Sequence, residues 1–185
     1  MDLGMSALLE LDGAEPCAVL CRELRLRFIE LNLNLPAYQP GEADVPSLRS
    51  IAEKYGIYYT IHMDENLNPW DLNPRVAEAY RQAAEEAIGL AKALEAPVLT
   101  MHLPAGVYFT LPEGRRYLFA QYRDRYLRAT EVFRELCTGA LAGTETVLCI
   151  ENTGGFQPFQ REALELLLES PAFGLTLDAG HSHAA

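Results

Sequence analysis

Segments with the features of β-strands and α-helices alternate along almost the whole chain of 185 residues. The strand-like runs are short, apolar and rich in β-branched or aromatic side chains, as in IYYTIH at 57–62 and TVLCIE at 146–151. We expect six strands, at 2–8, 27–33, 57–62, 97–102, 146–151 and 173–178, and five helices, at 15–24, 46–55, 73–95, 121–141 and 160–169. Such alternation predicts an α/β fold in which helices pack on the outside of a parallel sheet.

Local signals support the helix boundaries. Pro46 begins one predicted helix and Gly56 follows its end, which is the usual asymmetry of these two residues. Asn73 and Pro74 open the longest predicted helix in the same manner. Residues 104–118 are rich in proline and glycine and are therefore expected to form a longer loop or a small excursion from the barrel.

Two architectures fit this alternation, a (β/α) barrel and an open, doubly wound sheet. No predicted strand is followed by GxGxxG or by a P-loop, motifs that mark nucleotide-binding members of the open class. We therefore predict a parallel (β/α) TIM-type barrel. Complete barrels of this type have eight units and about 250 residues. With about six units, residues 1–185 are expected to be a single, C-terminally truncated domain.

The composition limits the classes of partner. Acidic residues outnumber basic ones by 26 to 15, which argues against a protein that binds nucleic acid through its phosphates. No apolar run is long enough to cross a membrane, and the N-terminus lacks the basic start of a signal peptide. None of the four cysteines belongs to a CxxC pair, so we expect free thiols in a cytoplasmic protein.

Polar side chains stand at the carboxyl ends of five successive predicted strands. They are Glu30, Asn32 and Asn34 on the second strand, His62 on the third, His102 on the fourth, Glu151 and Asn152 on the fifth, and Asp178 with His181 on the last. In parallel α/β proteins ligands bind at the carboxyl ends of the strands, and in closed barrels the active site is built there. We therefore expect these scattered residues to converge on one site.

Taken singly, these residues also have structural interpretations. A lone strand-end histidine, such as His62 or His102, is more often a hydrogen-bonded structural residue, and Asp178 is also compatible with a turn. Glu151 is harder to explain in this way, because it ends an apolar strand and a buried carboxylate needs a partner. Two histidines with Glu151 and Asp178 form a set of ligands that suits Zn²⁺, Mn²⁺, Co²⁺ or Fe²⁺.

Five segments of the sequence resemble one known superfamily. They are FIELNLNLP at 28–36, TIHMDENLNPWD at 60–71, LTMHLPAG at 99–106, CIENTGG at 149–155 and LTLDAGHSHAA at 175–185. The chain resembles the xylose isomerase-like TIM barrels, which comprise sugar-phosphate isomerases and epimerases and are related to endonuclease IV. The combination of IENTGG and LDAGH carries most of this resemblance. It implies that the last two βα units of the barrel are missing here.

The epimerase branch implies a role for each matching residue. Glu151 and Asp178 match the residues that bind one catalytic metal, often Mn²⁺, and His181 matches a histidine that contacts substrate. Glu151 is also a candidate for the catalytic base. Some ketose epimerases carry a glutamate six residues past the metal glutamate, and Gln157 departs from that pattern.

The endonuclease IV branch implies a different use of the same positions. There, His62 and His102 match zinc ligands, and Glu151 matches a carboxylate that bridges two metals. We therefore expect Glu151, Asp178, His102 and His181 to bind a divalent metal, either Mn²⁺ or Zn²⁺ with Mg²⁺ or Co²⁺ as alternatives. The residues expected to bind substrate are His62, His181, Asn32 and Trp70. Trp70 and the aromatic residues of 104–118 have a second interpretation as packing residues.

Three functions remain open. The first is a metal-dependent sugar or sugar-phosphate isomerase or epimerase that transfers a proton next to a carbonyl through an enediolate. The second is a zinc-dependent abasic-site endonuclease, and the third is an inactive barrel fragment that binds a sugar or a protein partner. A carbohydrate is the expected small-molecule ligand. A homo-oligomer is a further expectation, because an incomplete barrel has unpaired strand edges.

Overall fold

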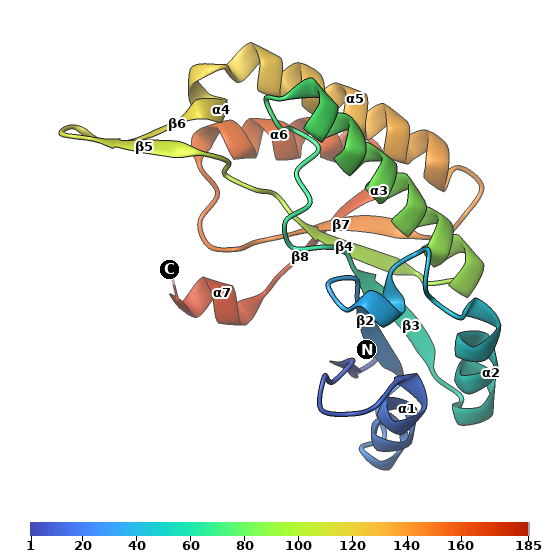
Figure 1. The fold of residues 1–185 in the computed structure, drawn as a ribbon. Helices are drawn as coiled ribbons and strands as arrows, with labels where there is room; N and C mark the ends of the chain where they lie inside the picture. Colours follow the sequence, from blue (N-terminus) through green and yellow to red (C-terminus); the bar gives the residue numbers. More distant parts are fainter. Residues whose placement is uncertain (185) are drawn as a thin grey trace.

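The computed structural model describes residues 1–184 (Figure 1). Its elements in chain order are β1 (Gly4–Ser6), α1 (Ala14–Glu23), β2 (Phe28–Asn32), the 3₁₀ turn η1 (Pro36–Tyr38), α2 (Val45–Tyr55), β3 (Tyr58–His62), α3 (Pro74–Leu94), β4 (Val98–His102), β5 (Tyr108–Leu111), β6 (Gly114–Tyr117), α4 (Leu118–Gln121), α5 (Arg123–Leu141), β7 (Val147–Glu151), α6 (Pro158–Leu168), β8 (Phe173–Thr176) and α7 (Ala179–Ala184). The alternation of strands and helices agrees with the prediction.

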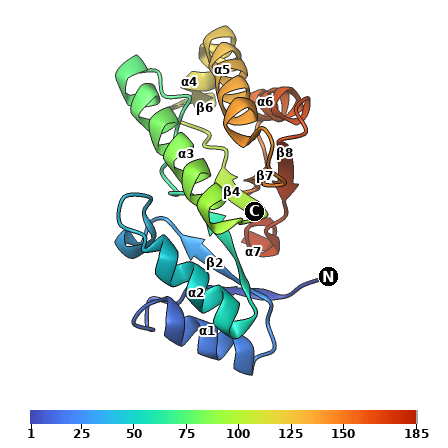
Figure 2. The same ribbon diagram turned by 90° about the vertical axis from the view of Figure 1, so that its right-hand side faces the viewer.

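Six strands form one parallel sheet in the order β1-β2-β3-β4-β7-β8. The helices α1, α2, α3, α5 and α6 lie along the outer side of this sheet, and consecutive helices contact one another (Figure 2). The arrangement is part of a (β/α) barrel, which confirms the predicted fold class. Because all six strands run in the same direction, their carboxyl ends lie at one end of the molecule.

One face of the central strands is fully buried, with apolar residues at every second position. Ile29 and Leu31 of β2, Leu99 and Met101 of β4, and Ile150 of β7 are all inaccessible to solvent. Each fully buried aliphatic side chain of this kind stabilises the fold by roughly 1.5–3 kcal/mol. This rigid core fixes the positions of the residues that end each strand.

Side chains and glycines at the helix ends explain the observed boundaries. The Asp44 carboxylate accepts a hydrogen bond from the Ser47 amide at the start of α2, and Gly56 ends that helix with a positive φ of 65°. Asn73 accepts a hydrogen bond from the Arg75 amide at the start of α3. These contacts satisfy backbone groups that a helix end leaves without partners.

The main differences between structure and prediction lie at the end of the chain and in residues 104–118. The last strand ends at Thr176 instead of Asp178, because Asp178 accepts a hydrogen bond from the His181 amide and starts the short helix α7. Residues 104–118, expected to be a loop, contain the hairpin β5–β6, in which Leu111 pairs with Gly114 across a two-residue turn.

All four cysteines are free, and Cys17, Cys21 and Cys137 are buried. Among residues 1–184, none of the helices combines the length and the apolar character that crossing a membrane requires.

Candidate metal centre

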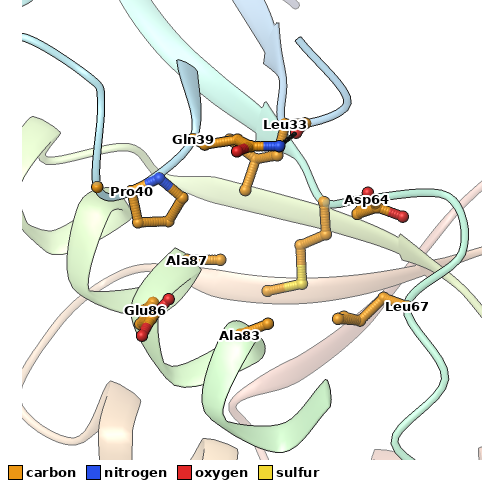
Figure 3. Close-up of a pocket in the computed structure, with 10 residues that line it drawn as sticks. Leu33, Gln39, Pro40, Asp64, Leu67, Ala83, Glu86 and Ala87 are labelled. Carbon is orange, nitrogen blue, oxygen red and sulfur yellow. Dashed lines mark hydrogen bonds between the residues drawn. The ribbon is translucent and has the colours of Figure 1, made fainter. Parts of the chain in front are cut away.

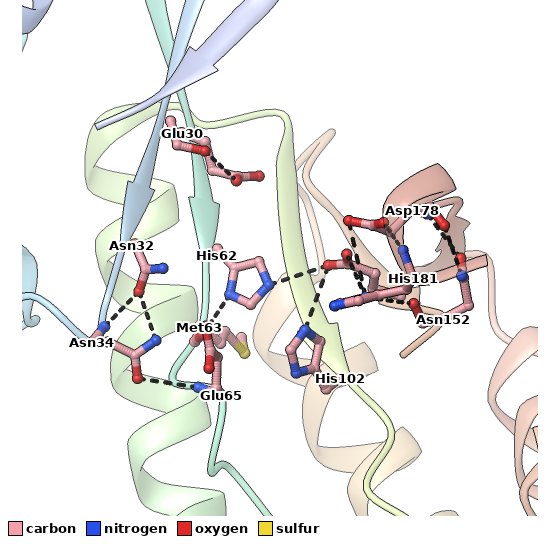
Figure 4. A network of polar contacts seen from close by, with 12 residues as sticks. Glu30, Asn32, Asn34, His62, Met63, Glu65, His102, Asn152, Asp178 and His181 are labelled. Atoms are coloured by element: carbon pink, nitrogen blue, oxygen red, sulfur yellow. Dashed lines mark hydrogen bonds and ion pairs between the residues drawn. The ribbon is translucent and has the colours of Figure 1, made fainter. Parts of the chain in front are cut away.

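A polar cavity of about 380 Å³ opens at the carboxyl ends of the strands. Its lining residues come from the ends of β2, β3, β4, β7 and β8, from the β3–α3 loop and from the segment that follows β8. They are Glu30, Asn32, His62, Glu65, His102, Glu151, Thr176, Leu177, Asp178 and His181. The structure thus brings together seven of the polar residues that the sequence places at strand ends (Figure 4). Neither lysine nor arginine occurs among these lining residues.

Glu151 lies at the centre of this cluster. It is the last residue of β7, it pairs in register with His102 of β4, and it is 6% exposed. Its Oε2 atom lies 3.2 Å from His62 Nε2 and 3.8 Å from His102 Nε2, and its Oε1 atom lies 3.8 Å from His181 Nδ1. One buried carboxylate therefore contacts or approaches three imidazoles from three different segments of the chain.

The candidate ligands fall into two groups that share Glu151. The first group is His62, His102 and Glu151, and the second is Glu151, Asp178 and His181; in each group the potential ligand atoms lie within 4.8 Å of one another. Imidazole nitrogens and carboxylate oxygens are suitable ligands for Zn²⁺ or Mn²⁺. The chemistry of this donor set fits a divalent metal.

The electrostatics of the cluster agree with this fit. Burial raises the pKa of Glu151, and the neighbouring Asp178 raises it further, whereas His62 opposes the shift. Burial lowers the pKa of His102, and the neighbouring His62 adds to the effect, so the neutral imidazole that binds metals is favoured. A cation bound here would stabilise the ionised carboxylate of Glu151, and the neutral imidazole of His102 could bind it as a ligand.

The second group depends on a short turn that Asn152 holds in place. The Asn152 side chain accepts a hydrogen bond from the Asp178 amide at 2.8 Å and donates one to the Asp178 carbonyl at 2.9 Å. The Asn152 carbonyl lies 3.0 Å from His181 Nδ1. The His181 amide donates to the Asp178 carboxylate at 2.6 Å, and this bond is the main cause of the lowered pKa of Asp178.

Asn32 lies on the opposite wall of the cavity and is held by its neighbours. Its side-chain oxygen accepts hydrogen bonds from the amide and the side chain of Asn34, both at 2.8 Å. Asn34 in turn accepts a hydrogen bond from the Glu65 amide at 3.3 Å. This chain of contacts orients Asn32 on the cavity wall and ties the loop after β3 to the end of β2.

Two carboxylates that line the cavity, Glu30 and Glu65, were not among the predicted metal ligands or substrate-binding residues. Glu30 points into it from β2, and burial raises the pKa of Glu30. Glu65 lies three residues after His62, in the loop that follows β3. The position of Glu30 within a strand-end cluster was a usable signal, whereas nothing in the loop sequence separates Glu65 from its neighbour Asp64.

Trp70 does not line the cavity. Its side chain is 1% exposed, its Nε1 donates a hydrogen bond to the Thr130 hydroxyl at 2.9 Å, and its ring packs edge-on against Phe133. These contacts hold it against α5. We therefore exclude Trp70 from the proposed substrate site, and the interpretation of Trp70 as a packing residue agrees with the structure.

A second cavity of about 280 Å³ lies between the loop after β2, the loop after β3 and helix α3 (Figure 3). Leu33 and Met63 on its wall directly follow Asn32 and His62, which line the metal centre. Leu33, Met63 and Leu67 are at most 5% exposed. Its described lining residues include carboxylates at the rim but no imidazole, so the polar cavity is the better candidate for chemistry.

Comparisons with known proteins agree with this architecture. The sequence matches the family model described as xylose isomerase-like TIM barrel over residues 19–185. A comparison with curated proteins gives no match.

Several solved structures share the fold. A D-tagatose 3-epimerase-like protein is 21% identical, with a TM-score of 0.74 and coverage of 98% of this chain and 66% of that one. The 3-keto-D-glucoside 4-epimerase from E. coli is 12% identical, with a TM-score of 0.75 and coverage of 98% of this chain and 69% of that one. The D-psicose 3-epimerase from Clostridium cellulolyticum H10 is 13% identical, with a TM-score of 0.72 and coverage of 98% of this chain and 64% of that one. The chain therefore spans about two thirds of the length of these structures.

Proposed function

The chain belongs to the xylose isomerase-like TIM barrel family, and from this premise we propose that it is a metal-dependent sugar isomerase or epimerase. The observation that carries the proposal is the buried Glu151 carboxylate, which three imidazoles and Asp178 surround at the carboxyl end of the sheet. The structures named above that share the fold include two sugar epimerases and an epimerase-like protein. This likeness supports a carbohydrate as the substrate.

The proposed ligands are Glu151, Asp178, His181 and His102, with His62 beside them. When bound, the metal would supply positive charge that polarises a carbonyl group and its neighbouring hydroxyl. Glu151 is also the proposed group that accepts or returns the proton, because its carboxylate lies buried at the centre of the ligand cluster. His62 donates or accepts at Nε2 next to Glu151, and Asn32 presents an amide to the same space.

The charge of the cavity favours an uncharged sugar over a sugar phosphate. Four carboxylates, those of Glu30, Glu65, Glu151 and Asp178, line it, and its described lining contains no lysine or arginine. A phosphate group would be repelled by these carboxylates, and phosphate sites usually offer arginine, lysine or a helix N-terminus. We therefore propose free ketoses or related neutral sugars as the substrate class.

Metal content and turnover test the proposal together. Wild-type protein and Glu151→Gln would be loaded with Mn²⁺ or Zn²⁺, analysed for bound metal, and assayed on a panel of ketoses and ketose phosphates. We expect one or more bound metals and turnover of neutral sugars in the wild type. In the variant, loss of the proton-transfer group alone predicts turnover reduced by at least about 100-fold.

Glu135→Gln is the matched control, because Glu135 is an exposed carboxylate on α5 outside the cavity. It should retain both metal and turnover. Unchanged metal affinity in Glu151→Gln would sink the proposed centre. A metal-loaded wild type that turns over no sugar on the panel would instead reject catalysis and leave sugar binding as the function.

One observation favours a second candidate, a zinc-dependent endonuclease for abasic sites. His62 and His102 form the first ligand group with Glu151, and Glu151 also belongs to the second group, so it is placed to bridge two metals. The acidic charge of the chain argues against this candidate. Cleavage of an abasic duplex by protein that contains at least two zinc ions, without turnover of sugars, would favour it over the first proposal.

A further inference from the structure

The second cavity, which lies against α3, has a largely apolar lining (Figure 3). We refer to it as the α3 cavity. The buried side chains of Leu33, Met63 and Leu67 line it, and Ala83 and Ala87 of α3 complete the apolar surface. Cavities lined mainly by apolar side chains, with a few polar groups that fix orientation, are typical of sites for small molecules.

Hydrogen bonds hold the two loops that form its walls. The Gln39 side chain donates to the Leu33 carbonyl at 3.4 Å, which ties the loop after β2 to the end of that strand. In the loop after β3, the Leu67 amide donates to the Asp64 carbonyl at 3.0 Å, and the Asn66 amide donates to the Asp64 carboxylate at 2.7 Å. The cavity is thus formed before any ligand enters, which lowers the cost of binding.

Two carboxylates give the α3 cavity its charge. Asp64 comes from the loop after β3 and Glu86 from α3, and Figure 3 shows them on opposite sides of the cavity. Among the ion pairs of the described residues, none includes Asp64 or Glu86. The lining residues of the cavity include neither lysine nor arginine. Two negative charges therefore flank an apolar space without a cation to balance them.

We propose that the α3 cavity binds a short aliphatic diamine. Its two ammonium groups would pair with Asp64 and Glu86, and its methylene chain would lie on the apolar lining between them. An anion would be repelled by both carboxylates, and a monoamine would leave one of them without a partner. This inference is independent of the proposed catalytic function, because no candidate metal ligand lines the α3 cavity.

Titration of ¹⁵N-labelled protein with 1,4-diaminobutane, followed by NMR in the presence of a chelator, tests the proposal. We expect a dissociation constant of about 1 mM or below, with shifts of the amides of Gly41, Leu67 and Ala83 around the cavity. n-Butylamine should bind at least about fivefold more weakly, because it forms one ion pair instead of two. The uncharged butane-1,4-diol should not bind.

Two variants of the cavity have matched controls on the same helix. Ala83→Trp should abolish binding by filling the cavity, and the double variant Asp64→Asn/Glu86→Gln should raise the dissociation constant by at least about tenfold. Ala79→Trp and Glu85→Gln make the same kinds of change at exposed positions of α3 outside the cavity. Both controls should bind the diamine like wild type.

Several results would overturn the proposal. One is the absence of amide shifts with the diamine at about 10 mM. Another is equal affinity for the diamine and for n-butylamine or butane-1,4-diol, which would remove the role of the paired carboxylates. Cavity variants that bind like wild type, with their fold confirmed by circular dichroism, would also reject it. Because a chelator is present throughout, failure of the proposed metal centre would not change these outcomes.

Discussion

Asn152 joins two segments of the metal centre although it is not itself a candidate ligand. Its side chain makes two hydrogen bonds with the backbone of Asp178, and its carbonyl approaches the ring of His181. Contacts of this kind fix the orientation of metal ligands, and their loss typically costs about 10- to 100-fold in metal affinity. Asn152 is thus a positioning residue.

Asn152→Ala is therefore expected to weaken metal binding by about 10- to 100-fold while the protein stays folded. Isothermal titration with Mn²⁺ or Zn²⁺, together with a urea unfolding curve, measures both quantities. Asn66→Ala, at an exposed loop position outside the cavity, is a suitable control and should bind metal normally. Normal affinity in Asn152→Ala would show that Asp178 and His181 hold their positions without it.

Glu151 is expected to destabilise the metal-free fold at neutral pH. Its pKa in the folded protein is raised, so ionisation costs folding free energy, and this cost grows as the pH rises above the ordinary glutamate value of about 4.3. In the presence of a chelator, Glu151→Gln should accordingly unfold at higher urea concentration than wild type at pH 7. The difference should vanish below pH of about 4. A variant less stable than wild type at pH 7 would contradict this expectation, and Glu135→Gln provides the baseline.

The strand-end residues could be predicted because parallel strands place their carboxyl ends together. Once the strands were assigned correctly, the convergence of His62, His102 and Glu151 followed. Trp70 could not be assigned in this way. A tryptophan in a loop after a strand serves equally well as a substrate platform or as a packing residue, and its contact with Thr130, 60 positions later, decides between them. Such long-range contacts leave no signal in the local sequence.

At the scale of elements, Trp70 links the loop after β3 to α5 through its hydrogen bond to Thr130 and its packing against Phe133. Trp70→Phe removes the indole donor and part of the buried volume. We expect it to lower the free energy of unfolding by about 1–3 kcal/mol. Metal affinity should not change, which titration of the folded variant would show. Loss of metal binding with unchanged stability would restore Trp70 to the site.

Helix α7 and the hairpin β5–β6 escaped prediction for identifiable reasons. Helix α7 has six residues, AGHSHA, with glycine and histidines that favour helices weakly, and it forms because Asp178 accepts hydrogen bonds at its start. The hairpin β5–β6 contains Pro112 and Gly114, which are typical of loops, and these residues fall at its turn. The longer strands and helices, whose apolar patterns extend over more residues, were predicted to within a few positions.

At the scale of the whole molecule, a bound metal should stabilise the fold measurably. Binding to the folded state alone contributes about 2.7 kcal/mol at a free metal concentration of about 100 times the dissociation constant. For a chain of this size this corresponds to a rise in melting temperature of roughly 5–10 °C. Differential scanning fluorimetry with and without chelator measures the rise, which Glu151→Gln should abolish. Identical melting of metal-loaded and chelated wild type would count against the metal centre.

The contact between His62 and Glu151 spans 89 positions of the chain. Holding these side chains together closes a long loop, and each time the contact re-forms the chain loses the conformational entropy of that loop. A metal that binds both groups would suppress openings that separate β3 from β7. Amide hydrogen exchange in these two strands should then slow together when metal binds, so the same ions that serve chemistry would also set how often this half of the sheet opens.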